Sequence, residues 1–122
     1  LAQLMPASAN ITDKLRNKVA AYIKDNFIDT AKIGQGGNST NPVVNDLDVA
    51  LSVSPTINKA IAGTSNVIET KVSVAGSSIT GKVVREVGLF DGSDMIQRIN
   101  FSGVGPFASN EDLEIFIIME VE

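Results

Sequence analysis

The sequence contains no cysteine, no histidine and no tryptophan, and only one tyrosine among its 122 residues. The missing cysteine excludes disulfides and thiolate zinc sites, and the missing histidine removes the usual general base at neutral pH. Without tryptophan, a surface that stacks sugars or bases would depend on five phenylalanines. Most designs of enzyme are therefore disfavoured, and we expect no catalytic residue, no cofactor and no metal ion.

Charge and hydropathy argue against two further classes of partner. The formal net charge is -4, and the ten lysines and arginines are spread along the chain instead of forming a basic cluster. Phosphate binding needs such a cluster, so we expect no nucleic-acid partner. No apolar run approaches the roughly 18 to 20 residues that span a bilayer, so we expect no membrane partner.

Alternating side chains dominate the second half of the chain. Residues 82–103 read as two extended runs around Asp91-Gly92-Ser93-Asp94, where Gly92 supplies the positive φ of a tight hairpin turn. Residues 69–75 and 111–122 show the same period of two. We predict that the hairpin and these two runs form one antiparallel meander.

The first part of the chain predicts an arm and a helix. Residues 1–11 lack any period and are expected to form an arm, while residues 12–122 form a single domain. Thr12 is a favourable N-cap for a helix over residues 12–26. Its apolar stripe consists of Leu15, Val19, Tyr22, Ile23 and Phe27. The polar, net basic face is expected to be solvated or, alternatively, to dock an acidic neighbour. The predicted fold is a mainly β, antiparallel β-sandwich with an N-terminal amphipathic helix.

A glycine-rich stretch covers residues 34–42. It lacks the Lys-Ser/Thr and the following helix of a phosphate-binding loop, so we expect the glycines to fold the chain back tightly. Two glycosylation sequons, at residues 10–12 and 38–40, are patterns that occur often by chance.

Two pairs of acids deserve a chemical interpretation. We expect one helical turn within residues 43–51, capped by Asn45, in which Asp46 and Asp48 are first-turn acids and not cation ligands. The hairpin acids Asp91 and Asp94 are expected to form the turn. The alternative is that they act together as a glycosidase pair.

The first strand of the hairpin carries apolar residues on both faces. Val84, Glu86, Gly88 and Phe90 alternate with Val83, Arg85, Val87 and Leu89. A strand covered on both sides is expected, its second face lying against the helix or another subunit. Gly88 indicates that another group approaches closely there.

The last run adds exposed apolar positions. Phe116 and Ile118 fall on the same face as the acids Glu114 and Glu120. Exposed apolar side chains of this kind suit self-association. We therefore predict a subunit interface that contains Val84, Phe90, Phe116 and Ile118.

The segment Glu86-Val87-Gly88-Leu89-Phe90-Asp91-Gly92, followed by Arg98 and the closing strand, resembles small tail and tail-fibre attachment proteins of tailed phages and related prokaryotic viruses. The resemblance covers most of residues 12–122. It implies structural roles for Glu86, Gly88, Phe90 and Arg98. Arg85 or Arg98 is expected to pair with Glu86 as a surface pair, which contributes only about 0 to 1 kcal/mol.

The resemblance also implies a place and partners. The expected location is the virion tail, at the baseplate, tail tip or fibre base, after assembly in the host cytoplasm. The expected partners are other copies of the chain, as a trimer or hexameric ring, and other tail or fibre proteins. Two alternatives stay open: a capsid decoration or head-fibre protein, and a carbohydrate-binding β-sandwich that uses the loops at 34–42 and 102–110. The absence of tryptophan counts against the second.

Overall fold

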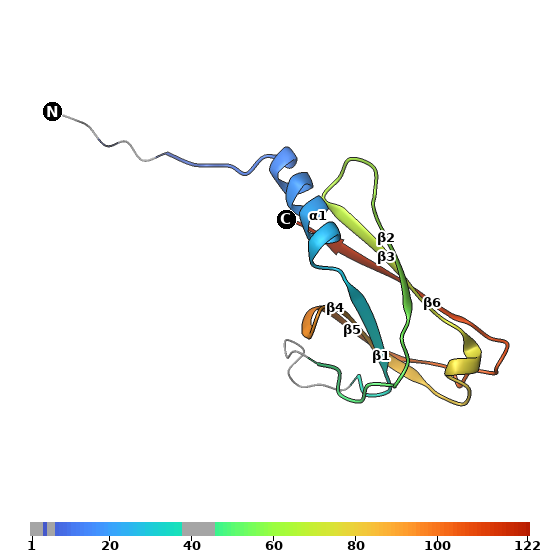
Figure 1. Cartoon of the computed structure of the whole chain (residues 1–122). Helices are drawn as coiled ribbons and strands as arrows, with labels where there is room; N and C mark the ends of the chain where they lie inside the picture. Colours follow the sequence, from blue (N-terminus) through green and yellow to red (C-terminus); the bar gives the residue numbers. More distant parts are fainter. Residues whose placement is uncertain (1–3, 5–6, 38–45) are drawn as a thin grey trace.

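The computed structural model describes Leu4 and residues 7–37 and 46–122, and it consists of two small sheets with one α-helix (Figure 1). In chain order the elements are α1 (Asp13–Asn26), β1 (Thr30–Gly34), β2 (Thr56–Ile61), β3 (Val67–Val74), the 3-10 turn η1 (Gly76–Ser78), β4 (Val84–Asp91), β5 (Asp94–Val104) and β6 (Leu113–Glu120). The predicted mainly β sandwich with an N-terminal helix is confirmed.

Each sheet combines a hairpin with one strand from elsewhere in the chain. The first has the order β1-β4-β5 and the second the order β2-β3-β6, and all pairs are antiparallel. The hairpin turn is confirmed: Asp91 pairs with Asp94, and Gly92 between them has φ +58°.

The predicted meander of β3, β4, β5 and β6 in one sheet is wrong. β3 ends at Val74, and η1 leads the chain across to the other sheet, where β4 pairs with β1. β6 then returns to β3, with Ile117 opposite Thr70. Two sheets packed face to face bury the apolar inner face of each, whereas a single meander would leave one such face in water.

The core lies between the two inner faces. Ile33, Val87 and Leu89 come from one sheet, and Ile68 and Ile117 from the other, and all are at most 2% exposed. Burial of each such side chain contributes about 1.5 to 3 kcal/mol. β3 alternates strictly between half-buried and buried residues, as its sequence predicts.

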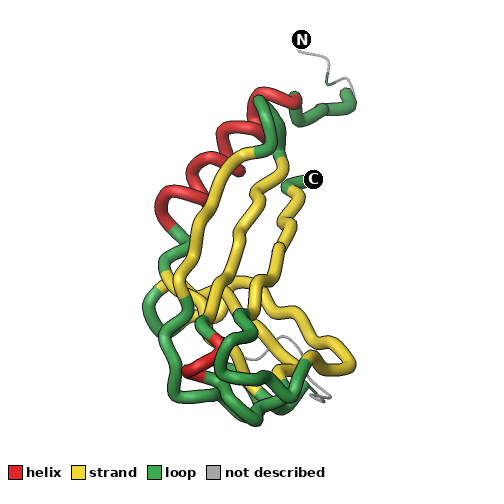
Figure 2. The backbone as a smooth tube through the Cα atoms, turned by 90° about the vertical axis from the view of Figure 1, so that its right-hand side faces the viewer, coloured by secondary structure: helices red, strands yellow, loops and turns green. Residues whose placement is uncertain are grey.

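The helix begins where the sequence predicts. Thr12 is the N-cap, and its hydroxyl accepts the N–H of Leu15 at 3.3 Å. Figure 2 shows α1 running beside the long strands of the β2-β3-β6 sheet. Ala20, which is fully buried, and Ile23 join the core from the helix. Of the expected polar face, Asn17 turns towards the body and donates to the Thr64 carbonyl at 2.9 Å.

Residues 46–50 form bends and an isolated bridge from Ala50 to Gly34. For this part of the segment the predicted helical turn is wrong. Its predicted cap, Asn45, and the second sequon lie outside the described residues.

Candidate functional site

The outer face of β4 is covered by the chain's own segment between β1 and β2. Phe90 is fully buried, and Leu47 from this segment is 8% exposed. A Cβ added at Gly88 would lie 2.9 Å from the Phe90 ring and 3.3 Å from Leu47 Cδ2. Lys32 Nζ lies 4.5 Å from the centroid of the Phe90 ring. The close approach predicted at Gly88 is thus present, and it is made by residues of the same chain.

The burial of Val84 and Phe90 corrects the prediction that they belong to a subunit interface. Both are 0% exposed within the single chain, so neither is available as the surface residue that the interface prediction required. A register shift between Val84 and Glu86 turns Val84 into the inner core, which breaks the regular alternation read from the sequence. Phe90 keeps its expected outer face, where Lys32 lies over its ring and Leu47 and Met95 lie beside Gly88, and it is fully buried within the single chain.

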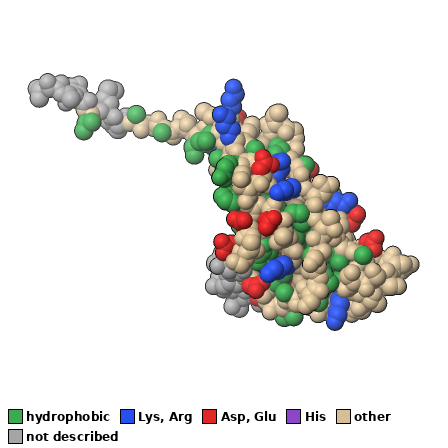
Figure 3. Space-filling model, viewed as in Figure 1, with side chains coloured by type: hydrophobic (Ala, Val, Ile, Leu, Met, Phe, Trp, Pro, Cys, Tyr) green, Lys and Arg blue, Asp and Glu red, His purple; other side chains and the backbone are tan. Residues whose placement is uncertain are grey.

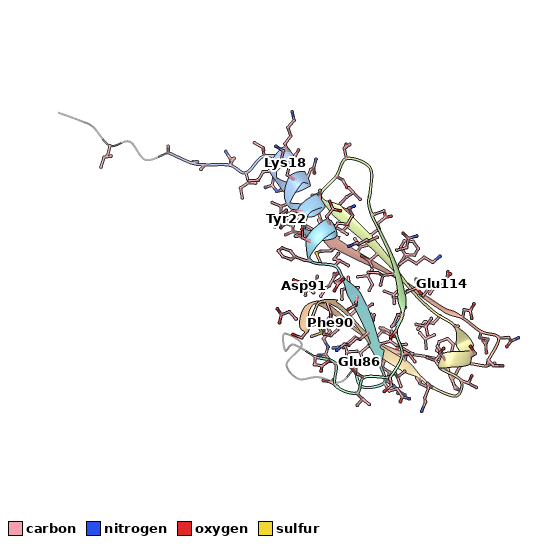
Figure 4. The ribbon with its side chains drawn as sticks, viewed as in Figure 1. Lys18, Tyr22, Glu86, Phe90, Asp91 and Glu114 are labelled. Atoms are coloured by element: carbon pink, nitrogen blue, oxygen red, sulfur yellow. The ribbon has the colours of Figure 1, made fainter. Side chains whose placement is uncertain are left out.

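Glu86 is the centre of a buried polar cluster on this outer face. It is 0% exposed, and its carboxylate accepts the N–H of Gly37 at 2.6 Å and that of Asp48 at 2.6 Å. The N–H of Val49 approaches the same carboxylate at 3.4 Å. The Glu86 side chain thus holds the segment between β1 and β2 at two points, Gly37 and Asp48. Figure 4 shows Glu86 and Phe90 on the lower part of the molecule, where this segment passes.

Arg98 completes the cluster from the neighbouring strand β5. Its Nη2 lies 3.1 Å from Asp48 Oδ1 and 3.6 Å from Glu86 Oε1, and its side chain is 4% exposed. Its Nη1 donates to the Asp46 carbonyl at 2.9 Å and its Nε to Asn100 Oδ1 at 3.1 Å. The pairing of Arg98 with Glu86 that the sequence predicts is present. The expectation that it is a surface pair is wrong, because the segment between β1 and β2 covers both groups.

The glycines are required because the segment passes so close to Glu86. A Cβ at Gly36 would lie 2.2 Å from Glu86 Oε2, and one at Gly34 would lie 2.4 Å from the Val49 carbonyl oxygen. Real Cβ atoms do not approach other atoms this closely, so only glycine fits. The described part of the glycine-rich stretch folds back as predicted. Glu86 is enclosed by this loop and closed to solvent, so the cluster is suited to holding the loop.

Of the two acid pairs singled out in the sequence, Asp46 and Asp48 have partners of opposite charge. Asp48 faces Arg98, and Asp46 Oδ1 lies 4.0 Å from Lys32 Nζ and accepts the N–H of Leu47 at 2.8 Å. Asp91 and Asp94 lie opposite each other at the end of the hairpin. Among the described residues, no three acids gather in a group that would hold a metal ion.

Two apolar surfaces remain exposed outside the core. On β6, Phe116 is 66% and Ile118 is 62% exposed, and both project from the outer face of the β2-β3-β6 sheet. This is the exposure that the interface prediction needs at these two positions, and their role as an interface stays a prediction. The second exposed apolar surface lies on α1, and the sequence did not predict it.

The helix buries only part of its predicted apolar stripe. Leu15 is 48%, Val19 38% and Tyr22 59% exposed, while Ala20 and Ile23 make the contact with the core. Tyr22 packs edge-on against Phe27, with ring centroids 5.6 Å apart. Figure 3 shows hydrophobic side chains along the helix side of the molecule. The sequence shows one wide apolar stripe on the helix. It does not reveal which part of that stripe packs against the core and which part stays exposed.

A shallow hollow of about 490 Å³ lies between the segment before β2 and the end of β3. It is lined mainly by hydroxyl side chains, with no aromatic ring and no charged group among its lining residues. Sugar sites usually offer an aromatic face for stacking. The hollow therefore adds no support to a carbohydrate-binding role.

Comparison of the chain with family models, with curated proteins and with solved structures finds no match. In the part of the chain that the structure describes, no helix is long and apolar enough to cross a membrane.

Proposed function

We propose that the protein is a non-enzymatic structural component of a viral particle, a tail, baseplate or fibre-base module that associates with copies of itself and anchors neighbouring tail or fibre proteins. The observation that carries the proposal is the pair of exposed apolar surfaces on α1 and β6. Leu15, Tyr22, Phe116 and Ile118 are each 48% or more exposed. Contiguous exposed apolar side chains on a small domain are typical of protein interaction sites.

The polar residues support the same proposal. The four residues that carry the resemblance to phage tail proteins, Glu86, Gly88, Phe90 and Arg98, lie on one face of one sheet. There Glu86 and Arg98 order a loop through buried hydrogen bonds and ion pairs. A network of this kind rigidifies a surface, which is what a repeating assembly requires of its subunit.

Immunogold electron microscopy on purified particles of the virus that encodes the chain tests this proposal, with antibodies raised against the purified domain. Label at the tail, the baseplate or the fibre base is the expected result. Label on the head would replace the proposal with a capsid decoration or head-fibre role. Particles that carry no label, and whose mass spectra contain no peptide of this chain, would overturn it.

A further inference from the structure

The exposed apolar side chains of α1 are flanked by lysines. Leu15, Val19 and Tyr22 recur at spacings of three and four residues, so they share one side of the helix, and Lys14 and Lys18 lie beside them with the same spacing. Both lysines are exposed. We call these five residues the helix surface. The helix as a whole carries four basic and two acidic side chains, a net charge of +2 in a chain whose total is -4.

The other basic side chains of α1 have partners on their own chain. Lys24 Nζ lies 2.8 Å from Asp25 Oδ1, and its hydrogen bond and charge hold the pKa of Asp25 below its ordinary value. Arg16 donates to the Ile11 carbonyl at 2.9 Å and lies 3.5 Å from Asp13. Lys14 and Lys18 are thus the cations next to the apolar side chains.

The exposed apolar side chains of β6 are flanked by acids. Phe116 and Ile118 lie between Glu114 and Glu120 on the exposed face of the strand, and the register places Glu69 of β3 opposite Ile118. We call these five residues the sheet surface. Lys71 lies opposite Phe116 and 3.1 Å from Glu114, so the sheet surface together with Lys71 carries a net charge of -2.

The two surfaces point away from each other. Ala20 and Ile23 attach the helix to the core side of the molecule, whereas Phe116 and Ile118 project from the outer side of the β2-β3-β6 sheet. Figure 4 accordingly labels Lys18 and Tyr22 on the helix and Glu114 on the opposite side. One chain is therefore unable to cover its own helix surface with its own sheet surface.

We infer that the helix surface of one copy packs on the sheet surface of a second copy. Each surface offers apolar side chains that gain by leaving water, and the lysines around one meet the glutamates around the other. Pairing like with like would instead place Lys14 and Lys18 against the same lysines, or glutamates against glutamates. Charge complementarity thus selects the head-to-tail contact over a two-fold symmetric one.

A contact between two different patches of the same chain repeats itself. Such a heterologous interface closes into a ring when its rotation allows and continues as an open fibre when it does not. The inference rests on the self-association in the proposed function, and it adds which surfaces meet and that the contact is head to tail.

The test uses two variants that each lose one surface. The helix variant carries Leu15→Gln and Tyr22→Gln, and the sheet variant carries Phe116→Thr and Ile118→Thr. The substitutions are neutral, so the two damaged surfaces do not attract each other. Circular dichroism and amide NMR spectra first establish that both variants fold as the wild type does.

We expect each variant alone to sediment as a monomer, with a dissociation constant raised by about a hundredfold, because each apolar side chain lost from an interface weakens binding by roughly tenfold. An equimolar mixture retains one intact contact and should form a dimer that grows no further. Association of either variant at wild-type strength would overturn the inference, as would a mixture that stays monomeric under conditions where the wild type associates.

Charge reversal gives the matched control. Lys14→Glu with Lys18→Glu should weaken association of the otherwise wild-type chain by about tenfold or more. Adding Glu114→Lys and Glu120→Lys to the same chain should restore association, and failure to restore it would contradict the contact.

The two proposals fail on different results. Wild-type association without heterodimer formation in the mixture of variants removes only the head-to-tail inference, whereas unlabelled particles remove only the virion role.

Discussion

Glu86 and Arg98 meet on the covered face of the β1-β4-β5 sheet, with Arg98 Nη2 3.6 Å from Glu86 Oε1 and almost no solvent access to either side chain. Burying two charges costs several kcal/mol for each, and their attraction offsets this cost only when further hydrogen bonds complete the site. Here backbone N–H groups of Gly37 and Asp48 supply those bonds to Glu86. The pair therefore holds the segment between β1 and β2 against the outer face of β4.

Removing the acid should be strongly destabilising. We expect Glu86→Ala to lower the free energy of unfolding by about 3 to 5 kcal/mol, because it removes one of the two carboxylates beside the buried Arg98 and leaves two backbone N–H groups without an acceptor. Urea denaturation at a concentration where the chain is monomeric measures the loss. The control is Glu114→Ala, which breaks the exposed pair with Lys71 and should cost about 0 to 1 kcal/mol. Equal losses of stability in the two variants would contradict the role of Glu86 in holding the segment between β1 and β2.

Arg98 should not tolerate replacement by lysine. Its guanidinium contacts Asp46, Asp48, Glu86 and Asn100 at once, and a lysine ammonium is unable to reproduce this planar set of contacts. We expect Arg98→Lys to destabilise the fold by about 2 kcal/mol or more.

A double-mutant cycle measures how far the two residues depend on each other. Combining Glu86→Ala with Arg98→Ala should give a loss smaller than the sum of the single losses, with a coupling of about 0.5 to 3 kcal/mol. Strictly additive losses would show that the two side chains act independently.

The glycine at position 36 should be essential for sterics alone. Its added Cβ would lie 2.2 Å from Glu86 Oε2, so Gly36→Ala forces the loop off the sheet and should cost about 1 to 3 kcal/mol or more. Gly63→Ala is the comparison: nothing lies within 4 Å of its Cβ, and only its φ of +65° opposes alanine, at about 1 to 2 kcal/mol. Amide spectra distinguish them, since Gly36→Ala should shift resonances near Gly37, Asp48 and Val49. Unshifted resonances there would contradict the close packing.

Substitution of neighbouring residues of β6 should change the stability of the monomer by very different amounts. Ile117 is 2% exposed, so Ile117→Ala should destabilise the monomer by about 2 to 5 kcal/mol. Phe116→Thr should change monomer stability by less than about 0.5 kcal/mol, because its side chain is already 66% in water. Urea midpoints of the two variants check this contrast. A large loss for Phe116→Thr would mean that its side chain contributes to the fold, and not to a surface.

Much of the local structure could be predicted from the residues themselves. The turn at Gly92 follows from its conformational freedom, and the exposure of Phe116 and Ile118 follows from a period of two shared with Glu114 and Glu120. Thr12 was identified as the N-cap from its side chain and position alone.

The sheet partners were beyond this reasoning, because alternation reveals which face of a strand is buried and not which strand lies beside it. The burial of Glu86 under the segment between β1 and β2 is unpredictable from the sequence for a related reason. Glu86 accepts hydrogen bonds from Asp48, 38 residues away in the sequence, and from Gly37, 49 residues away. Such long-range hydrogen bonds leave no periodic signal in either segment.

The exposed apolar surfaces on α1 and β6 are proposed to serve association of the chain with copies of itself. Sedimentation equilibrium of the wild-type chain over about 1 to 100 micromolar measures this directly, since contacts of moderate strength lie in that range. We predict that the average mass rises with concentration above that of a single chain, and that Phe116→Thr with Ile118→Thr abolishes the rise. A wild-type chain that keeps the mass of one copy over the whole range would contradict self-assembly.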